Sequence, residues 1–326
     1  MIFCPLLIII LYGCQGGEQP LTRTNILLGT FVTITDYDYG LDKSQINPAL
    51  DSAFAAIATI EAMTNPYDST SAIGEINSYS DSRNRFKIDE PLHSILAEAM
   101  AVSRRSNGAF EFTLWPVFKL WNFGENSGSI PSHKEISEAK KLVDYRKLIL
   151  KPGELQFEMG GMQIDLGGIV KGFAVEAARK IMKGYGLKNF IIDAGGNLGI
   201  EWHKEEPVQI YVRHPRKDGE FWAQFPVRRS LGIATSGDYQ YYFIKDGKRY
   251  HHIIDPANGY PAEPTVSCTI VAENAILADG MSTAVFVMGP DRGSKFIESN
   301  PEIEGIMVFP LNGKFHTFVS GGLKAT

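Results

Sequence analysis

Apolar residues recur at helical spacing in several segments of the chain. Asn47–Met63 is rich in alanine and predicts a helix that ends at the turn sequence Asn65–Asp68. Leu92–Ser106 predicts a second helix, which Asn107 and Gly108 close. The first part of the chain is therefore expected to contain helices of ordinary globular length.

Two further helices have clear end signals. Ser132 and Glu135 have the spacing of a capping box, which predicts that a helix begins there. Ala275–Met288 predicts a longer helix that ends at the Gly289–Pro290 pair. Another helix and a strand over Gly305–Pro310 complete the expected core.

Short apolar and β-branched runs predict strands between these helices. The runs are Leu27–Thr35, Met162–Leu166 and Asn189–Asp193, and the last is followed by a tight turn at Gly195–Asn197. The segment after Met162–Leu166 has helical spacing at Ile169, Phe173, Ala177, Ile181 and Met182. Because strands and helices alternate irregularly, we expect an α+β fold rather than a doubly wound sheet.

Asp246 and Gly247 lie between two strand-like runs, which predicts a β-hairpin over Tyr239–Ile253. With these two residues as the turn, Lys245 pairs with Lys248 and Tyr241 lies opposite His252. Continuing the pairing brings Asp238 near Asp255. The hairpin is therefore expected to gather four polar side chains at one end: Ser236, Asp238, His252 and Asp255.

Composition narrows the class of protein. The 326 residues are 44% hydrophobic and 21% charged, which is ordinary for a globular protein, and they suffice for one large domain or two small ones. The net charge of −5 and the lack of a basic cluster argue against a nucleic-acid partner. After Cys14 the next cysteine is Cys268, so we expect no internal disulfide in the body of the protein and a core-filling role for Cys268.

The N-terminal segment reads as a targeting signal. Ile2–Gly13 is nearly all apolar, carries no charge and is too short to span a membrane. A small residue followed by Cys14 resembles the cleavage site of a bacterial lipoprotein, although no Lys or Arg precedes the apolar run. The alternatives are an ordinary secretory signal and a buried strand.

This interpretation predicts three parts of the chain. Residues 1–13 are a signal segment, residues 14–24 a linker that begins at a lipidated Cys14, and residues 25–326 a single domain. We expect the mature protein to be anchored by lipid to the periplasmic side of the inner membrane.

The segment Asp165–Gly172 has the features of a phosphate site. A carboxylate, Asp165, precedes the Gly167–Gly168 pair, and a helix then begins with Lys171 in its first turn. Glycines at such a junction let a ligand approach the backbone, and a helix start offers free N–H groups to an anion. The glycine pattern is neither a P-loop nor a dinucleotide fingerprint, and a plain turn with a buried aspartate is the alternative.

Asp279 and Thr283 lie four residues apart on one face of the predicted Ala275–Met288 helix, with Ser282 beside them. A carboxylate with hydroxyl groups is a hard oxygen donor set that suits Mg²⁺, which takes the rest of its ligands from water and substrate phosphates. A solvated helix face or a local hydrogen bond is the alternative. The chain has no Cys/His cluster that indicates zinc.

Strand alternation places His251 and His252 on opposite faces of the hairpin, so only one of them can face a given site. A structural role is the alternative for either. Tyr239, Tyr241 and Tyr242 could stack on a flat ligand, although hairpin tyrosines more often pack.

Several separated segments, in order along the chain, together resemble the ApbE family of bacterial FAD:protein FMN transferases. They are Leu28–Thr30, Tyr67–Asp68, Glu75–Asn77, Gly108–Thr113 with Pro116, Asp165–Gly172, Ala194–Asn197, Ala234–Gly237, His252–Pro256 with Gly259, and Ala278–Gly289. The segments around Asp165, His252 and Asp279 are the specific ones.

The resemblance implies a two-lobed α+β fold with mixed and antiparallel sheets, flanking helices, and FAD in the cleft between the lobes. The residues expected to contact FAD are Leu28, Tyr67, Ala109, Phe110, Glu111, Asp165, Lys171, His252 and Ile254. The carbonyl of Gly168, with Asp279, Thr283 and the neighbouring Ser282, is expected to hold Mg²⁺.

Two positions depart from the family pattern. Leu28 stands where the family has Met, and Glu111 stands where it has Asp. The longer arm of Glu111 is expected to shift a polar contact with the adenine or the ribose.

The implied activity is Mg²⁺-dependent transfer of FMN from FAD to a Thr or Ser hydroxyl of exported or membrane redox proteins, with release of AMP. His252 is the expected base, because an unshifted histidine titrates near neutral pH, and Asp255 is expected to orient it. The alternatives are an FAD diphosphatase that uses water as the acceptor and a non-catalytic FAD-binding lipoprotein.

Overall fold

The computed structural model describes residues 19–38, 43–81, 84–123 and 128–324. The segments predicted to be the signal, its cleavage site and Cys14 lie outside these ranges. Among the described residues, no helix combines the length and the apolarity that a membrane span requires.

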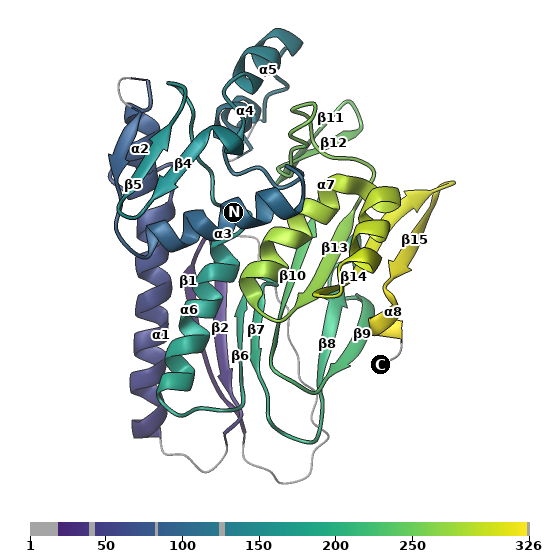
Figure 1. Ribbon diagram of the computed structural model, residues 1–326. Helices are drawn as coiled ribbons and strands as arrows, with labels where there is room; N and C mark the ends of the chain where they lie inside the picture. The colour runs from purple at the N-terminus through teal and green to yellow at the C-terminus, as the bar shows by residue number, and fades with distance from the viewer. Residues whose placement is uncertain (1–18, 39–42, 82–83, 124–127, 325–326) are drawn as a thin grey trace.

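An eight-stranded antiparallel sheet forms the centre of the molecule (Figure 1). Its strands, in spatial order, are β1 (Leu21–Leu27), β2 (Thr30–Asp36), β6 (Phe190–Ala194), β7 (Leu198–Glu201), β10 (Leu231–Gly237), β13 (Ser267–Ala272), β14 (Ile303–Leu311) and β15 (Lys314–Val319). Smaller sheets are β3 (Arg85–Lys87) with β5 (Glu154–Phe157) and β4 (Leu148–Lys151), β8 (Val208–Arg213) with β9 (Phe221–Val227), and β11 (Tyr242–Lys245) with β12 (Lys248–His251).

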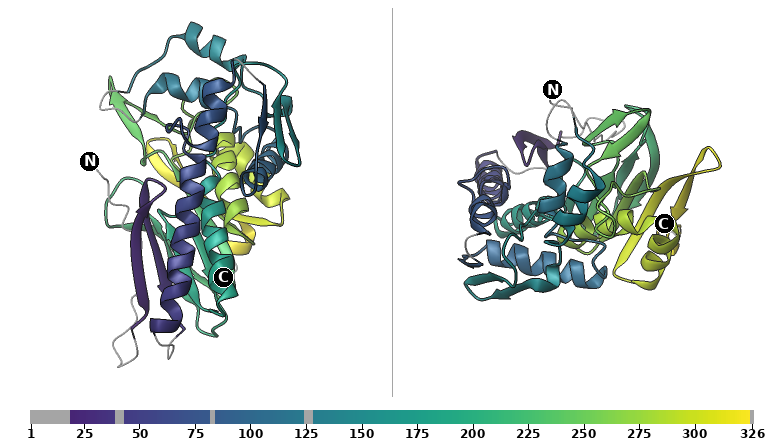
Figure 2. Two further views of the ribbon diagram at one scale, coloured as in Figure 1. Left: turned by 90° about the vertical axis from the view of Figure 1, so that its left-hand side faces the viewer. Right: turned by 90° about the horizontal axis from the view of Figure 1, so that it is seen from above.

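Helices cover one face of the large sheet, and the β8–β9 pair covers part of the other. Figure 2 shows α1 lying beside the β1–β2 hairpin, and α6 packs between α1 and α7. The helices are α1 (Lys43–Thr64), α2 (Ala72–Tyr79), α3 (Leu92–Arg105), α4 (Trp115–Trp121), α5 (His133–Lys140), η1 (Tyr145–Lys147), α6 (Val170–Gly184), α7 (Ala275–Ser299) and α8 (Gly321–Lys324). This arrangement confirms the α+β class.

Most of the predicted helices are confirmed. Ser132 and Glu135 make both hydrogen bonds of the capping box at α5. The helix that begins at Ala275 breaks at Gly289, whose φ of 74° is not helical, and a second helical stretch runs on to Ser299. Cys268 is completely buried in the core, as expected.

Two strand predictions are wrong. Leu27–Thr35 is not one strand, because Leu28 and Gly29 have φ values of 55° and 68° and turn the chain between β1 and β2. Met162–Leu166 is not a strand either. Apart from one bridge at Gln163, its backbone pairs with a side chain and a loop. Strands β3, β4, β5, β8, β9 and β15 were not predicted.

The β11–β12 hairpin has the predicted register at its tip and a different arrangement at its base. Lys245 pairs with Lys248, and the N–H of His252 donates to the carbonyl of Tyr241 over 3.0 Å. The N–H of Asp238 instead donates to the carbonyl of Val266, because β10 continues along β13. The expected meeting of Asp238 and Asp255 is therefore wrong.

The contact between α6 and α7 depends on Gly172. A Cβ atom at this position would overlap the carbonyl oxygen of Ala275 and lie 2.7 Å from the Cβ atom of Asp279. Gly184, at the other end of the same helix, has nothing within 4 Å of the equivalent point. Only a residue without a side chain lets the first turn of α6 approach α7 this closely.

We therefore expect Gly172→Ala to lower the free energy of unfolding by about 1–3 kcal/mol, because the added methyl group forces the two helices apart. Gly184→Ala is the matched control, and its better helix propensity raises stability by at most about 1 kcal/mol. Urea denaturation measures both. Equal stability of the two variants would show that the close approach is not needed.

Candidate active site

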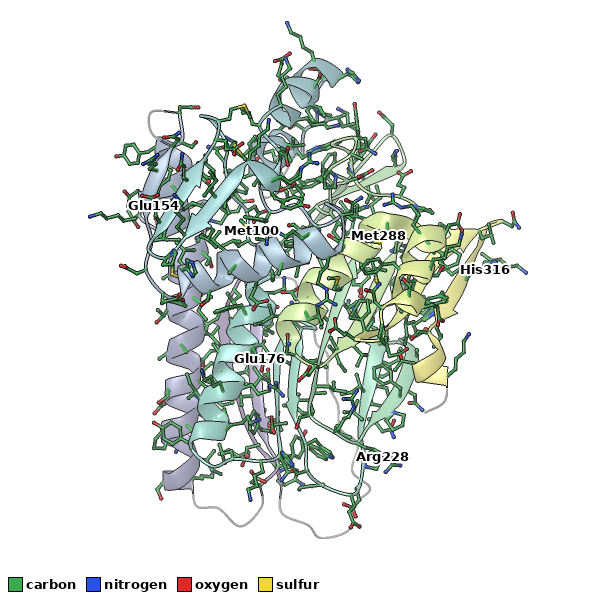
Figure 3. All side chains as sticks on the ribbon, viewed as in Figure 1. Met100, Glu154, Glu176, Arg228, Met288 and His316 are labelled. Carbon is green, nitrogen blue, oxygen red and sulfur yellow. The ribbon has the colours of Figure 1, made fainter. Side chains whose placement is uncertain are left out.

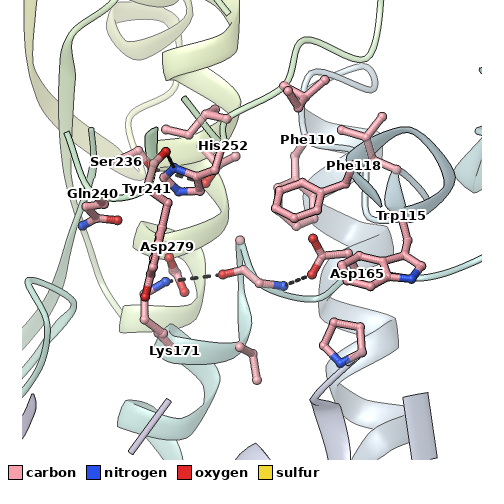
Figure 4. A pocket seen from close by; sticks show the side chains of 18 of the residues that line it. Phe110, Trp115, Phe118, Asp165, Lys171, Ser236, Gln240, Tyr241, His252 and Asp279 are labelled. Carbon is pink, nitrogen blue, oxygen red and sulfur yellow. Dashed lines mark hydrogen bonds between the residues drawn. The ribbon is translucent and has the colours of Figure 1, made fainter. Parts of the chain in front are cut away.

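A cavity of about 540 Å³ is lined by the first turn of α6, one face of α7, the end of β10, α4 and the base of the β11–β12 hairpin. One side is aromatic, where Trp115 and Phe118 of α4 stack at 5.6 Å and Tyr67 meets Trp115 edge-on at 4.9 Å. The other side is polar and carries Lys171, Ser236, His252 and Asp279 (Figure 4). The two sides suit a ligand with flat rings and an anionic group.

The Asp165 segment is held by bonds from residues far away in the sequence. The side-chain amide of Asn77 donates to the carbonyl of Ile164 over 2.8 Å and accepts from its N–H over 2.7 Å. The N–H of Asp165 donates to the carbonyl of Phe112. These bonds replace the missing sheet partner, and they fix the direction in which Asp165 enters the cavity.

Asp165 and Lys171, both predicted to contact the ligand, line the cavity. The Oδ1 atom of Asp165 accepts from the N–H of Gly167 over 2.8 Å, and Lys171 Nζ lies 3.4 Å from the carbonyl oxygen of Gly167 (Figure 4). Burial raises the pKa of Asp165, against the opposing effects of the Gly167 N–H and the Lys171 charge.

Asp279 joins α7 to two other parts of the site. It is 3% exposed, and its two oxygens accept from the N–H of Gly172 over 2.7 Å and from the amide of Asn197 over 3.2 Å. Thr283 lies one turn further along α7, on the same face. Its Oγ1 is 3.4 Å from the point where a Cβ of Gly168 would lie. Three predicted oxygen donors, on Gly168, Asp279 and Thr283, therefore gather at the cavity wall.

Ser282 does not line the cavity, unlike the other members of the predicted donor set. Its hydroxyl donates to the carbonyl of Asp279 over 2.9 Å and lies 2.8 Å from the hydroxyl of Ser236. Ser236 in turn lies 3.2 Å from Thr283 Oγ1 and faces the cavity. Ser282 thus lies behind the cavity wall and contacts two residues that line it.

The donor set fits Mg²⁺. The described residues contain no group of three His, Cys, Asp or Glu side chains that could hold a metal by themselves. One carboxylate, one hydroxyl and one backbone carbonyl are hard ligands, and they leave room for water and phosphate oxygens, which is the usual state of protein-bound Mg²⁺.

His252 faces the cavity and His251 does not, as strand alternation predicts. Burial, followed by repulsion from His251 and Lys171, lowers the pKa of His252 to about 3. The expectation of an unshifted histidine is therefore wrong, and the ring is neutral near pH 7. His252 Nδ1 lies 3.3 Å from the carbonyl oxygen of Tyr241. His251 is buried, packs edge-on against Phe286 and contacts the carbonyl of Ala262, which is a structural role.

Asp255 does not line the cavity. Its carboxylate accepts from the N–H of Ala257 over 2.9 Å and from the amide of Asn258 over 2.7 Å. These bonds close the turn after Ile254, so the structure gives Asp255 no contact with His252.

The remaining predicted ligand contacts all line the cavity. They are Leu28, Tyr67, Ala109, Phe110, Glu111 and Ile254. The carboxylate of Glu111 accepts from the N–H and hydroxyl of Thr113 and from the N–H of Tyr145, so its longer arm bonds within its own loop. Of the three hairpin tyrosines, Tyr241 lines the cavity, whereas Tyr239 and Tyr242 do not.

Several cavity residues were not predicted as site residues. Trp115 and Phe118 face the cavity from α4, and the run of aromatic residues in Trp115–Trp121 is the signal that could have indicated them. Glu61 of α1 lines the cavity and accepts from the N–H of Leu28 over 2.7 Å. Gln240 carries no pattern that marks it.

Comparison with known proteins identifies the family that this chain matches. The model of the ApbE family matches residues 28–307. An FAD:protein FMN transferase of Treponema pallidum is 29% identical over 319 residues, which cover 91% of this chain and 88% of that protein. The Haemophilus influenzae protein of the same name is 27% identical, over 89% of this chain and 87% of its own.

Solved structures of ApbE proteins are also similar to this chain. The ApbE protein of Thermotoga maritima superposes with a TM-score of 0.85 at 31% identity and covers 94% of this chain and 99% of its own. The flavinyl transferase ApbE of Pseudomonas stutzeri, in its apo form, has a TM-score of 0.82 at 27% identity, over 94% and 96% of the two chains.

The different positions of Thr283 and Ser282 give a matched pair of variants. We expect Thr283→Val to weaken Mg²⁺ binding in the presence of FAD by about tenfold, the equivalent of one lost oxygen contact of about 1.4 kcal/mol. Ser282→Ala leaves the cavity wall intact and changes the affinity less than about twofold. Calorimetric titration with Mg²⁺ measures both, and equal losses would contradict the placement of Ser282 behind the site.

Proposed function

Because this chain belongs to the ApbE family, we propose that it transfers FMN from FAD to a threonine or serine hydroxyl of an acceptor protein, releases AMP and requires Mg²⁺. The observation that carries the proposal is a single cavity with an aromatic side, a hard oxygen donor set and a neutral histidine.

The two sides of the cavity match the two kinds of chemistry in FAD. The aromatic side offers Trp115, Phe118 and Tyr67 to flat rings. The polar side offers the charge of Lys171, where a diphosphate is best stabilised. Asp279, Thr283 and the carbonyl of Gly168 would hold Mg²⁺, which when bound screens the diphosphate and stabilises the charge on the leaving oxygen.

His252 is placed to take the proton of the acceptor hydroxyl. A pKa of about 3 makes its ring a weak base, so this role requires the negative charge of the bound diphosphate to raise that pKa. The carbonyl of Tyr241 can only accept a hydrogen bond, so its contact with Nδ1 requires the proton on Nδ1 and leaves a lone pair on Nε2. The acceptor oxygen forms a bond to the FMN-side phosphorus while the phosphorus–oxygen bond to AMP breaks. Phosphoryl transfer depends on positioning and charge stabilisation, so no covalent step on the enzyme is needed.

We further propose that the acceptor is an exported or membrane redox protein and that this chain is anchored near it by lipid on Cys14, on the periplasmic side of the inner membrane. The support is the apolar Ile2–Gly13 segment directly ahead of Cys14.

The activity is tested by incubating the purified protein with FAD, Mg²⁺ and a redox protein that carries an exposed threonine. We expect covalent FMN on the acceptor, a mass increase seen by mass spectrometry, and AMP in equal amount. His252→Gln should lower the rate of FMN transfer on the order of 10²–10⁴-fold, because it removes the base. His251→Gln should instead lower the stability of the fold, because His251 has a structural role. AMP formed equally fast without acceptor would identify a diphosphatase, and tight FAD binding without any AMP a flavin-binding protein.

Lipid anchoring is tested with Cys14→Ser in a bacterial host. We expect the wild-type protein to sediment with membranes and to incorporate labelled fatty acid, and the variant to do neither, because serine offers no thiol for lipidation. If the wild-type protein carried no label, the lipid anchor would be excluded. That result would not bear on the proposed transfer activity.

A further inference from the structure

The hairpin β11–β12 carries Tyr241 and His252 to the cavity, but it pairs with no other strand in the described part of the chain. A two-stranded hairpin is marginally stable by itself. Its inner face packs through Phe243 and Tyr250 on Phe123 and Trp121. Besides the bond from the N–H of Asp238 to the carbonyl of Val266, a side-chain attachment at its base sets the direction in which the hairpin leaves the sheet.

Asp238 supplies that attachment. It is 6% exposed and lies in the connection between β10 and β11. Arg216, in the turn after β8, donates from Nη1 to Oδ1 over 2.7 Å and from Nη2 to Oδ2 over 2.6 Å. The guanidinium also packs on the ring of Phe315, 5.6 Å from its centroid. A planar two-bond contact of this kind fixes orientation as well as distance.

A second arginine binds the backbone at the same residue. Arg249 of β12 donates to the carbonyl of Asp238 over 3.3 Å and lies 3.8 Å above the ring of Tyr242. The side chain of Asp238 is therefore tied to the β8–β9 sheet, and its carbonyl is tied to the hairpin. The connection is held from both sides.

The residues on either side of Asp238 are cavity residues. Ser236, two positions before it, contacts Thr283, and Gln240 and Tyr241 follow it (Figure 4). The carbonyl of Tyr241 in turn contacts both the N–H and the ring of His252. Asp238 therefore lies three residues before Tyr241, whose carbonyl contacts the proposed base.

We propose that Arg216 is a positioning residue: its two-bond contact with Asp238 sets the base of the β11–β12 hairpin and so places Tyr241 and His252 over the cavity. Arg216 itself does not line the cavity. The effect on catalysis rests on the proposed function, whereas the effect on the hairpin does not.

The test uses the full protein with Arg216→Ala, and with Arg216→Lys, which keeps the charge but loses the two-bond contact. The control is Arg228→Ala, at the opposite end of the β8–β9 sheet (Figure 3), where the guanidinium donates to the carbonyl of Glu205 over 3.1 Å and to no other described residue. Hydrogen exchange of residues 239–253 is measured without ligand. FMN transfer and Mg²⁺ affinity are measured separately.

For Arg216→Ala we expect hairpin exchange at least about tenfold faster and kcat lower by on the order of 10²-fold, the effect of a misplaced catalytic group. Mg²⁺ affinity should change less than about twofold, because Asp279 and Thr283 lie on α7. Arg216→Lys should fall between wild type and Arg216→Ala, and Arg228→Ala should match wild type. Adding Asp238→Asn to Arg216→Ala should cost nothing further, because the two residues act together.

Unchanged hairpin exchange in Arg216→Ala would overturn the proposal, and so would an equal loss in Arg228→Ala or faster exchange throughout the domain. A wild-type protein that transfers no FMN would instead refute the proposed function, while the exchange comparison would still decide the role of Arg216.

Discussion

The site depends on the close approach of α6 to α7. The carboxylate of Asp279 then links the two helices by a hydrogen bond. Gly172 removes the side chain that would keep the helices apart, and its N–H then donates to Asp279 at 2.7 Å. The same approach brings the backbone at Gly168 against Thr283. A carboxylate, a hydroxyl and a carbonyl from two distant stretches of chain thus share one wall of the cavity.

The other walls are built by a different means. The aromatic side comes from α4, where two rings stack, and from the loop after α1, whose Tyr67 meets Trp115 edge-on. The hairpin that carries His252 is fastened by aromatic packing at its inner face and by arginines at its base. The donor wall therefore belongs to the packed core between α6 and α7, whereas the wall that bears the proposed base is a smaller element attached to it.

Local patterns in the sequence indicated much of this arrangement, and the failures have physical causes. Asp279 and Thr283 share a helix face whatever surrounds them, so their pairing could be predicted from spacing. Met162–Leu166 has a strand's composition, but its partner is the side chain of Asn77, 87 residues from Ile164, and no local pattern encodes that contact. The turn at Leu28 could not be predicted from the sequence because leucine seldom adopts a positive φ. Asp255 and Asp238 do not meet as expected. Asp255 bonds within its own turn, and Asp238 binds Arg216.

The wide separation of Gly168 and Asp279 along the chain has a thermodynamic consequence. Neither helix alone presents the full set of oxygen ligands. Under the proposed function, the unfolded chain and partly folded chains therefore have little affinity for a magnesium-bound flavin dinucleotide. A ligand that binds only the complete structure shifts the folding equilibrium toward it by mass action. The supply of flavin in the compartment would then influence how long each molecule survives proteolysis, in addition to how fast it works.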